Sequence, residues 1–180
     1  MTEAQLSNAM DAYGSTVYRL ALTRMQNIAD AEDVYQEVFL RLWKQAAEDW
    51  DGDRAKAWLI RTTLNRCADL HRFRLRRPVL SFAEIPDLAQ PEDESRELWE
   101  AVSRLPEKAR TAVHLYYAEG YSAEEISQLM HIPAATVRTR LHRARKQLKE
   151  LLGGIDDETC VSRSLSLIHI SEPTRRSYIS

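Results

Sequence analysis

The stretch SAEEISQLMHIPAATVRTRLHRARKQLK, residues 122–149, has the pattern of two helices joined by a short turn. Ser122 and Glu125 have the spacing of a capping box, which marks the beginning of a helix that we expect to end at residue 130. The next three residues, HIP, predict a turn, and the basic segment after them predicts a longer helix that reaches about Leu152. Together these features predict a helix-turn-helix unit.

The longer helix has one apolar side and a basic remainder. At about 100° per residue, its apolar side chains fall within one narrow arc; they are Val137, Leu141, Ala144, Leu148 and Leu151. Between residues 135 and 149 the helix has six cations and no acid. The apolar side is expected to dock on a core, so the charge faces solvent or a partner. A solvated basic face, a membrane-surface helix and a calmodulin-type helix are alternatives to nucleic-acid binding.

The order of the two helices favours DNA. In helix-turn-helix proteins the second helix enters the major groove, where it needs cations for phosphates and side chains that reach base edges. The candidate base readers are Arg138, Thr139, His142 and Arg143. The predicted DNA-binding set is completed by Thr136 and by the candidate phosphate ligands Arg140, Arg145, Lys146 and Lys149.

The chain as a whole is slightly acidic despite this helix. It has 180 residues, with 25 Lys and Arg against 27 Asp and Glu, and 44% of its residues are hydrophobic, as in a globular protein. No apolar run approaches the roughly 20 residues of a membrane helix, and no signal peptide is visible. The distant cysteines Cys67 and Cys160 indicate neither a zinc site nor a disulfide framework. We therefore expect a cytoplasmic protein without a metal or other cofactor.

Charge is segregated along the chain. Residues 54–77 contain eight cations and one acid, whereas residues 84–100 contain seven acids and one cation. Two basic blocks on either side of an acidic block predict a polyanion that is held at two places. The acidic block overlaps a segment with several prolines, residues 79–95, which we expect to be a flexible linker.

The rest of the chain predicts helices and no strand. Helices are expected over 9–26, from Asp30 as N-cap to Lys44, from about Arg54 to Arg76, and over 96–105 and 107–120. The expected fold is all-α, with two small helical domains joined by a flexible linker: one domain over 1–78, the linker over 79–95 and the second domain over 96–153. A tail over 154–180 follows; from about residue 162 it resembles a translated vector fragment, and we expect it to be non-native.

Three segments resemble the sigma-70 family of bacterial RNA polymerase sigma factors: DAEDVYQEVFLRLW (30–43), AWLIRTTLNRCADLHRFRLRR (57–77) and the segment 105–145. Their order, their spacing and the short linker resemble the extracytoplasmic-function (ECF) branch, which keeps only domains two and four. The match covers about 10–77 and 96–152. The resemblance implies a protein that binds core RNA polymerase, directs it to promoters and helps to melt the minus-ten element, without being an enzyme.

The resemblance also assigns roles to two helices of the first domain. On the helix over 30–44 it implies a polymerase-binding surface made of Asp30, Asp33, Gln36, Glu37, Leu40 and Lys44. A scattered exposed leucine is the alternative for Leu40, which lies at the centre of that surface. On the helix over 54–77 it implies contacts with the minus-ten element from Arg54, Lys56, Trp58, Arg61, Asn65, Arg66 and Arg72. Asn65 matches a position near a flipped base, and a core tryptophan is the alternative for Trp58.

The partners that the resemblance implies are core RNA polymerase, promoter DNA as duplex and as melted strand, and an anti-sigma factor. The turn departs from the family, which often has Gly where this chain has His131 and Ala135; a left-handed backbone would favour Gly there. A stand-alone helix-turn-helix regulator, which binds duplex DNA by itself, is the alternative function. No catalytic or metal-ligating set of residues supports an enzyme.

Overall fold

A computed structural model describes residues 2–45, 52–76 and 93–152 of the protein. These ranges are helical throughout apart from short turns, and they contain no strand, which confirms the predicted all-α class. The chain divides into two compact units, Met1–Pro86 with Ser127–Ile132, and Asp87–Ile126 with Pro133–Ser180. Residues 46–51, most of the predicted linker and the tail from 153 lie outside the described residues.

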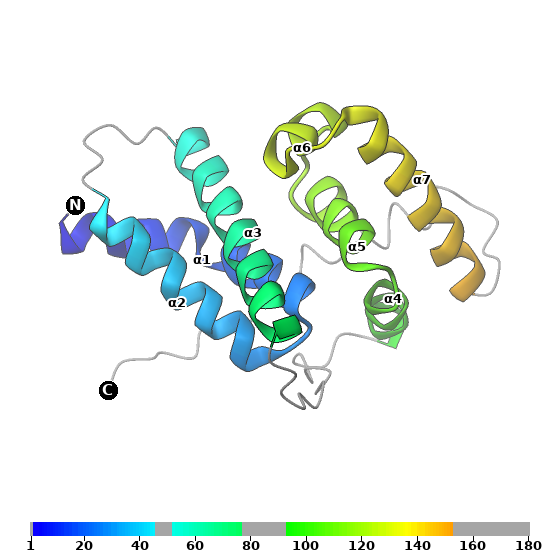
Figure 1. Ribbon diagram of the computed structural model, residues 1–180, viewed down its shortest axis with the longest axis horizontal. Helices are drawn as coiled ribbons and strands as arrows, with labels where there is room; N and C mark the ends of the chain where they lie inside the picture. Colours follow the sequence, from blue (N-terminus) through cyan, green and yellow to red (C-terminus); the bar gives the residue numbers. More distant parts are fainter. Residues whose placement is uncertain (1, 46–51, 77–92, 153–180) are drawn as a thin grey trace. The chain divides into compact units, whose positions relative to one another are not determined.

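Three helices build the first unit: α1 (Glu3–Met25), α2 (Ile28–Lys44) and α3 (Gly52–Arg76), and each packs against the other two (Figure 1). α1 begins six residues before the predicted position because Thr2 and Gln5 form a capping box. The Gln5 backbone N–H donates to the Thr2 hydroxyl over 3.3 Å, and the Thr2 N–H donates to the Gln5 side chain over 2.8 Å. These bonds satisfy two backbone donors at the beginning of the helix.

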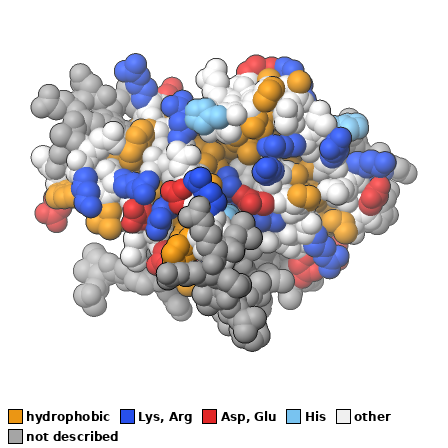
Figure 2. All heavy atoms as spheres, in the orientation of Figure 1, with side chains coloured by type: hydrophobic (Ala, Val, Ile, Leu, Met, Phe, Trp, Pro, Cys, Tyr) orange, Lys and Arg blue, Asp and Glu red, His pale blue; other side chains and the backbone are white. Residues whose placement is uncertain are grey.

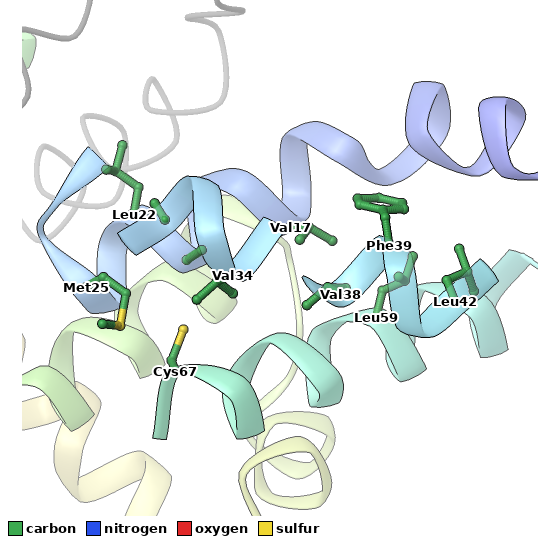
Figure 3. Packing of buried hydrophobic residues seen from close by; sticks show 11 residues of the cluster. Val17, Leu22, Met25, Val34, Val38, Phe39, Leu42, Leu59 and Cys67 are labelled. Atoms are coloured by element: carbon green, nitrogen blue, oxygen red, sulfur yellow. The ribbon is translucent and has the colours of Figure 1, made fainter. Parts of the chain in front are cut away.

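The buried side chains of the three helices point toward one another and form one apolar cluster (Figure 3). Its members are Val17, Ala21, Leu22, Met25, Ala31, Val34, Val38, Phe39, Leu42, Leu59 and Cys67. On α2 helical spacing predicts an apolar side of Val34, Val38, Phe39 and Leu42, and all four lie in this cluster. On α3 helical spacing predicts a buried side of Leu59, Thr63, Cys67 and Leu70; the first three are buried, whereas Leu70 is only half-buried. Burial of each large side chain stabilises the unit by about 1.5–3 kcal/mol.

The cap of α2 differs from the prediction. Asn27, in an extended conformation, is the N-cap, and its side-chain oxygen accepts the backbone N–H of Asp30 over 3.0 Å. Asp30 therefore lies in the first turn of the helix, with an exposed fraction of 7%, and its carboxylate pairs with Arg74 near the end of α3. The prediction was wrong because both residues are good capping types, and the sequence pattern placed the cap three residues late.

The second unit contains α4 (Asp93–Ser103), α5 (Glu107–Val113), a π-helical turn (His114–Ala118), α7 (Ala134–Leu151) and the first half of α6 (Ala123–Met130). The helix predicted over 107–120 thus changes to π geometry at His114, and Gly120 ends the segment with φ 75°. The guanidinium of the buried Arg110 donates to the carbonyls of Ser103 and Leu105 over 3.1 and 2.8 Å, which joins α5 to the end of α4.

α7 packs against α5 and α4 with the apolar side that the sequence predicts. Val137, Leu141, Ala144 and Leu148 are buried, and none is more than 4% exposed. Leu151 differs, because it lies in the last turn of α7 and is 43% exposed. A helical wheel gives the direction of a side chain but not how far the neighbouring helices extend along it. The wheel therefore placed Leu151 on the buried side, although no neighbouring helix among the described residues covers it.

Candidate nucleic-acid and protein interfaces

The capping box predicted at the beginning of α6 is present. The Glu125 backbone N–H donates to the Ser122 hydroxyl over 3.2 Å, and the Ser122 backbone N–H donates to the Glu125 carboxylate over 2.8 Å. These contacts lower the pKa of the Glu125 carboxyl, first through the Ser122 backbone N–H and second through the Ser122 hydroxyl. The entry to the helix-turn-helix is therefore held by reciprocal bonds that require Glu125 to be charged.

The turn between α6 and α7 is held by a residue other than glycine in a left-handed conformation. His131 has φ 53°, and the N–H of Ile132 donates to the carbonyl of Ser127 over 3.1 Å. This is the long-range bond of a Schellman motif, in which glycine is the usual left-handed residue. Ala135 is helical, so only one of the two positions at which the family often has Gly needs the left-handed conformation here. In Figure 1 the short turn leads directly into the long α7.

The cations of α7 lie away from its buried stripe. Six of the predicted DNA-binding residues are exposed: Arg138, Thr139, His142, Arg143, Lys146 and Lys149. Three are half-buried: Thr136, Arg140 and Arg145. The Thr139 hydroxyl donates to the carbonyl of Ala135 over 2.9 Å, and Arg138 forms an ion pair with Glu124 of α6. α7 thus presents guanidinium, imidazole and ammonium groups in its first four turns, the chemistry that contacts with phosphates and base edges require.

α2 has an exposed side with an apolar centre. The predicted residues Asp33, Gln36, Leu40 and Lys44 are exposed, and Glu37 is half-buried with its carboxylate 3.1 Å from Arg41 Nε. Leu40 is 54% exposed, and Trp43, one turn later, is 43% exposed. Trp43 was not predicted as part of this side, although its spacing of three from Leu40 places the two side chains next to each other on the helix surface. Asp30 does not join this side, because it is buried and paired with Arg74.

The predicted minus-ten residues of α3 are divided between surface and core. Arg54, Arg61, Asn65 and Arg72 are exposed, whereas Lys56, Trp58 and Arg66 are half-buried. The Trp58 side chain packs against the apolar cluster of the first unit, so the tryptophan serves the core and also reaches the surface. Arg72 pairs with Asp69 over 2.5 Å. Phe73, missed in the sequence, is 56% exposed beside this arginine. An exposed aromatic among arginines is suited to stacking on an unpaired base.

Other kinds of site receive no support from the described residues. They contain no group of three or more His, Cys, Asp or Glu side chains placed to hold a metal ion, and Cys67 is buried in the apolar cluster. No helix among them has the length and apolar character to cross a bilayer. On the face shown in Figure 2, Lys and Arg side chains lie among acidic and hydrophobic ones. The net charge therefore does not identify a binding surface, and the exposed sides of α2, α3 and α7 must be considered one by one.

Both helical parts of the chain match known protein families. Residues 9–77 match the family described as Sigma-70 region 2, and residues 95–148 match Sigma-70, region 4. The chain is 34% identical over 161 residues to the ECF RNA polymerase sigma factor SigE of Mycolicibacterium smegmatis, with 83% of this chain and 62% of that protein covered. It is 32% identical over 155 residues to the ECF RNA polymerase sigma factor SigM of Bacillus subtilis, with 81% of this chain and 94% of that protein covered.

A solved structure has the same fold. The sigma factor RpoE of Bartonella quintana, crystallised with the anti-sigma factor NepR, matches with a TM-score of 0.71 and 24% identity, over 85% of this chain and 99% of that one. The family matches lie on α1–α3 and on α4–α7, which are the elements that carry the candidate surfaces. With a relative that is 32% identical and 94% covered, the chain belongs to the sigma-70 family of RNA polymerase sigma factors, in its ECF branch.

Proposed function

We propose that this protein binds core RNA polymerase, directs it to a set of promoters and helps to melt the minus-ten region. The observation that supports this most is the presence in one chain of two unlike helical surfaces, an apolar-centred one on α2 and a cation-rich one on α7. The first suits a protein partner and the second suits DNA. A protein that brings an enzyme to DNA needs both kinds of surface.

The α2 surface is proposed to bind the polymerase. Leu40 and Trp43 form an apolar centre, and Gln36, Asp33 and Lys44 supply polar side chains around it. Protein interfaces commonly have this arrangement, in which a buried apolar centre is enriched in aromatic residues and surrounded by a polar rim. Asp30 is left out of the proposed contact set because its carboxylate is committed to Arg74.

α7 is proposed to read the minus-thirty-five element in the major groove. Its buried stripe fixes the helix on α5 and α4, so the exposed side has a defined direction. Arg138, His142 and Arg143 lie on that side in the first three turns of the helix, and the N-terminal part of this helix contacts base edges in helix-turn-helix proteins. Lys146 and Arg145 follow one turn later and suit phosphates.

α3 is proposed to hold the melted minus-ten strand. Arg61, Asn65 and Arg72 follow one another along one exposed side of the helix, and they combine cations with an amide that can both donate and accept. Extrusion of a base from the duplex loses stacking energy of a few kcal/mol, which must be offset by stacking and hydrogen bonds in the protein. Trp58, half-buried next to this row, is suited to that stacking.

The domain roles follow from these surfaces. We propose that residues 1–78 form the polymerase and minus-ten domain, that 79–95 link the domains, and that 96–153 form the minus-thirty-five domain. The protein is proposed to act in the cytoplasm as a regulatory subunit, without a reaction of its own and without a cofactor. The solved relative with NepR supports an anti-sigma factor as a further partner.

The proposal is tested by transcription with purified components. Bacterial core polymerase is mixed with a library of bacterial genomic fragments, with and without the protein, and the 5′ ends of the transcripts are sequenced. Transcripts that begin downstream of a shared two-part motif only when the protein is present are the expected result. If the protein binds the same motif tightly as duplex without polymerase, and adds no transcript, the stand-alone regulator takes the place of the sigma factor.

A further inference from the structure

An ion pair connects the two helices of the helix-turn-helix. Arg138 Nη2, on the second turn of α7, contacts Glu124 Oε1, on the first turn of α6, and the two residues are 14 apart in the sequence. Both side chains are 60% exposed, so the pair lies at the surface beside the candidate base readers. None of the roles proposed above uses the carboxylate of Glu124.

A contribution to folding stability does not explain the carboxylate at position 124. An exposed ion pair adds little to folding free energy, because water screens it and two long side chains lose rotamer freedom. The angle of α7 is already fixed by the buried stripe that includes Val137 and Leu141. The pair bears instead on the orientation of Arg138, because Glu124 contacts one nitrogen, Nη2, of a planar guanidinium whose donors have fixed directions relative to one another.

The charge of Glu124 also distinguishes base edges from phosphates. A carboxylate at a DNA-facing surface repels phosphate oxygens, and it competes with them for the guanidinium of Arg138. It does not repel the base edges in the major groove, where arginine donates to guanine O6 and N7 and a carboxylate accepts from cytosine N4. An arginine held by a carboxylate is therefore less suited to sequence-independent backbone contact and more suited to base contact.

We propose that Glu124 is a specificity-determining residue for promoter recognition by α7, which acts by positioning Arg138 toward base edges and by opposing its contact with phosphates. The inference rests on the proposed role of α7 in DNA binding. The proposal predicts two effects of opposite direction. Removal of the negative charge of Glu124 should strengthen binding to DNA in general and weaken the preference for the correct sequence.

The test uses the full chain with core polymerase. The specific probe is a duplex selected from random sequence by this holoenzyme, and the non-specific probe is an unselected duplex of the same length. For Glu124→Gln we expect the affinity for the unselected duplex to rise several-fold and the ratio of the two affinities to fall roughly tenfold, within the range for one bidentate base contact. The salt slope on the unselected duplex should increase by about one, since Arg138 then contacts a phosphate.

Two further variants separate positioning from charge and from folding. Glu150→Gln removes the same charge from the exposed far end of α7, and it should leave the ratio nearly unchanged. In an Arg138→Ala background, Glu124→Gln should have no further effect on the ratio, because the residue through which it acts is absent. An unchanged ratio in Glu124→Gln, an equal fall in Glu150→Gln, or the same fall in the Arg138→Ala background would overturn the inference.

Arg143→Ala distinguishes failure of this inference from failure of the proposed function. If Arg143→Ala and Arg138→Ala both leave binding to the selected duplex unchanged, α7 does not read DNA, and the inference falls with that role. If Arg143→Ala weakens selected-duplex binding while Glu124→Gln leaves the ratio intact, α7 reads DNA and only the role of Glu124 is wrong. Thermal unfolding of each variant separates out a structural effect, because a variant that keeps its Tm has changed the affinity ratio without a loss of helix stability.

Discussion

α2 and α7 are built alike on their buried sides. Each is an amphipathic helix with a stripe of aliphatic or aromatic residues that lies in the core of its unit; the stripes are Val34, Val38, Phe39 and Leu42 in α2, and Val137, Leu141, Ala144 and Leu148 in α7. Each follows a left-handed residue that is not glycine, Gln26 with φ 51° and His131 with φ 53°. The buried side therefore fixes each helix in place but says nothing about its partner.

The exposed sides of the two helices differ in the property that selects a partner. On α2 the exposed side has Leu40 and Trp43 at its centre and charges of both signs around them. On α7 it has arginine, lysine and histidine along most of its length, and its one large exposed apolar residue, Leu151, lies in the last turn. Desolvation of apolar area favours association with a protein, whereas release of counterions favours association with DNA.

The largest expected effect is that of a cation at the centre of the α2 surface. Leu40→Arg places a charge where an apolar contact is proposed, so affinity for core polymerase should fall at least about 100-fold, or roughly 3 kcal/mol. The change is at a side chain that is 54% exposed in the free protein, so circular dichroism should show an unchanged helix content. Binding to labelled core polymerase by fluorescence anisotropy measures the effect.

Met10→Arg is the matched control for this prediction. Met10 is 36% exposed on α1, in the same unit but on another helix, and it undergoes the same change from an apolar side chain to a cation. It should leave polymerase affinity within about threefold, as is usual for a position outside an interface. If both variants lost the same affinity for core polymerase, the loss would be due to any added charge in this unit. The α2 surface would then not be the polymerase-binding site.

Sequence periodicity was sufficient to predict which sides of α2 and α7 are buried and which are exposed. The spacing of Val34 and Val38, and of Val137 and Leu141, follows from 3.6 residues per turn, so the buried stripes and the opposite exposed sides were predicted correctly. Trp43 was missed although the same periodicity applies to it. A large aromatic residue is expected in a core, and the sequence alone does not tell how far a neighbouring helix covers it.

Contacts between helices could not be predicted in this way. The pairs Asp30–Arg74 and Glu124–Arg138 join residues 44 and 14 positions apart, and each depends on how two helices lie relative to each other. Asp30 was therefore assigned to the exposed side of α2, although its side chain points into the unit. The π-helical turn at His114 was also missed, since one additional residue in a turn leaves no signal in the hydrophobic pattern.

A smaller effect is expected from a single reader on α7. Arg143→Ala should weaken binding of the holoenzyme to its selected promoter by roughly 1–3 kcal/mol and relax the preference at one base pair, if the guanidinium makes a bidentate contact with a base. Lys146→Ala is the comparison, because a phosphate contact should be lost equally from selected and unselected duplexes, with a salt slope lower by about one. Equal behaviour of the two variants would remove Arg143 from the base readers.

The smallest expected effect tests the turn that leads into α7. His131 is exposed and has φ 53°, a conformation that costs a residue with a Cβ about 1–2 kcal/mol. His131→Gly removes that cost but adds backbone entropy to the unfolded chain, so we expect a net stabilisation of about 0.5–1 kcal/mol. In a unit of this size, thermal unfolding by circular dichroism should show a Tm several degrees higher.

Ala135→Gly should change stability in the opposite direction. Ala135 lies in the first turn of α7 with helical geometry, so glycine there relieves no strain and lowers stability by up to about 1 kcal/mol. The family often has Gly at both positions, and the two variants therefore separate a glycine that the turn requires from one that it does not. If His131→Gly lowers Tm as Ala135→Gly does, the imidazole of His131 contributes more to the turn than its backbone conformation costs.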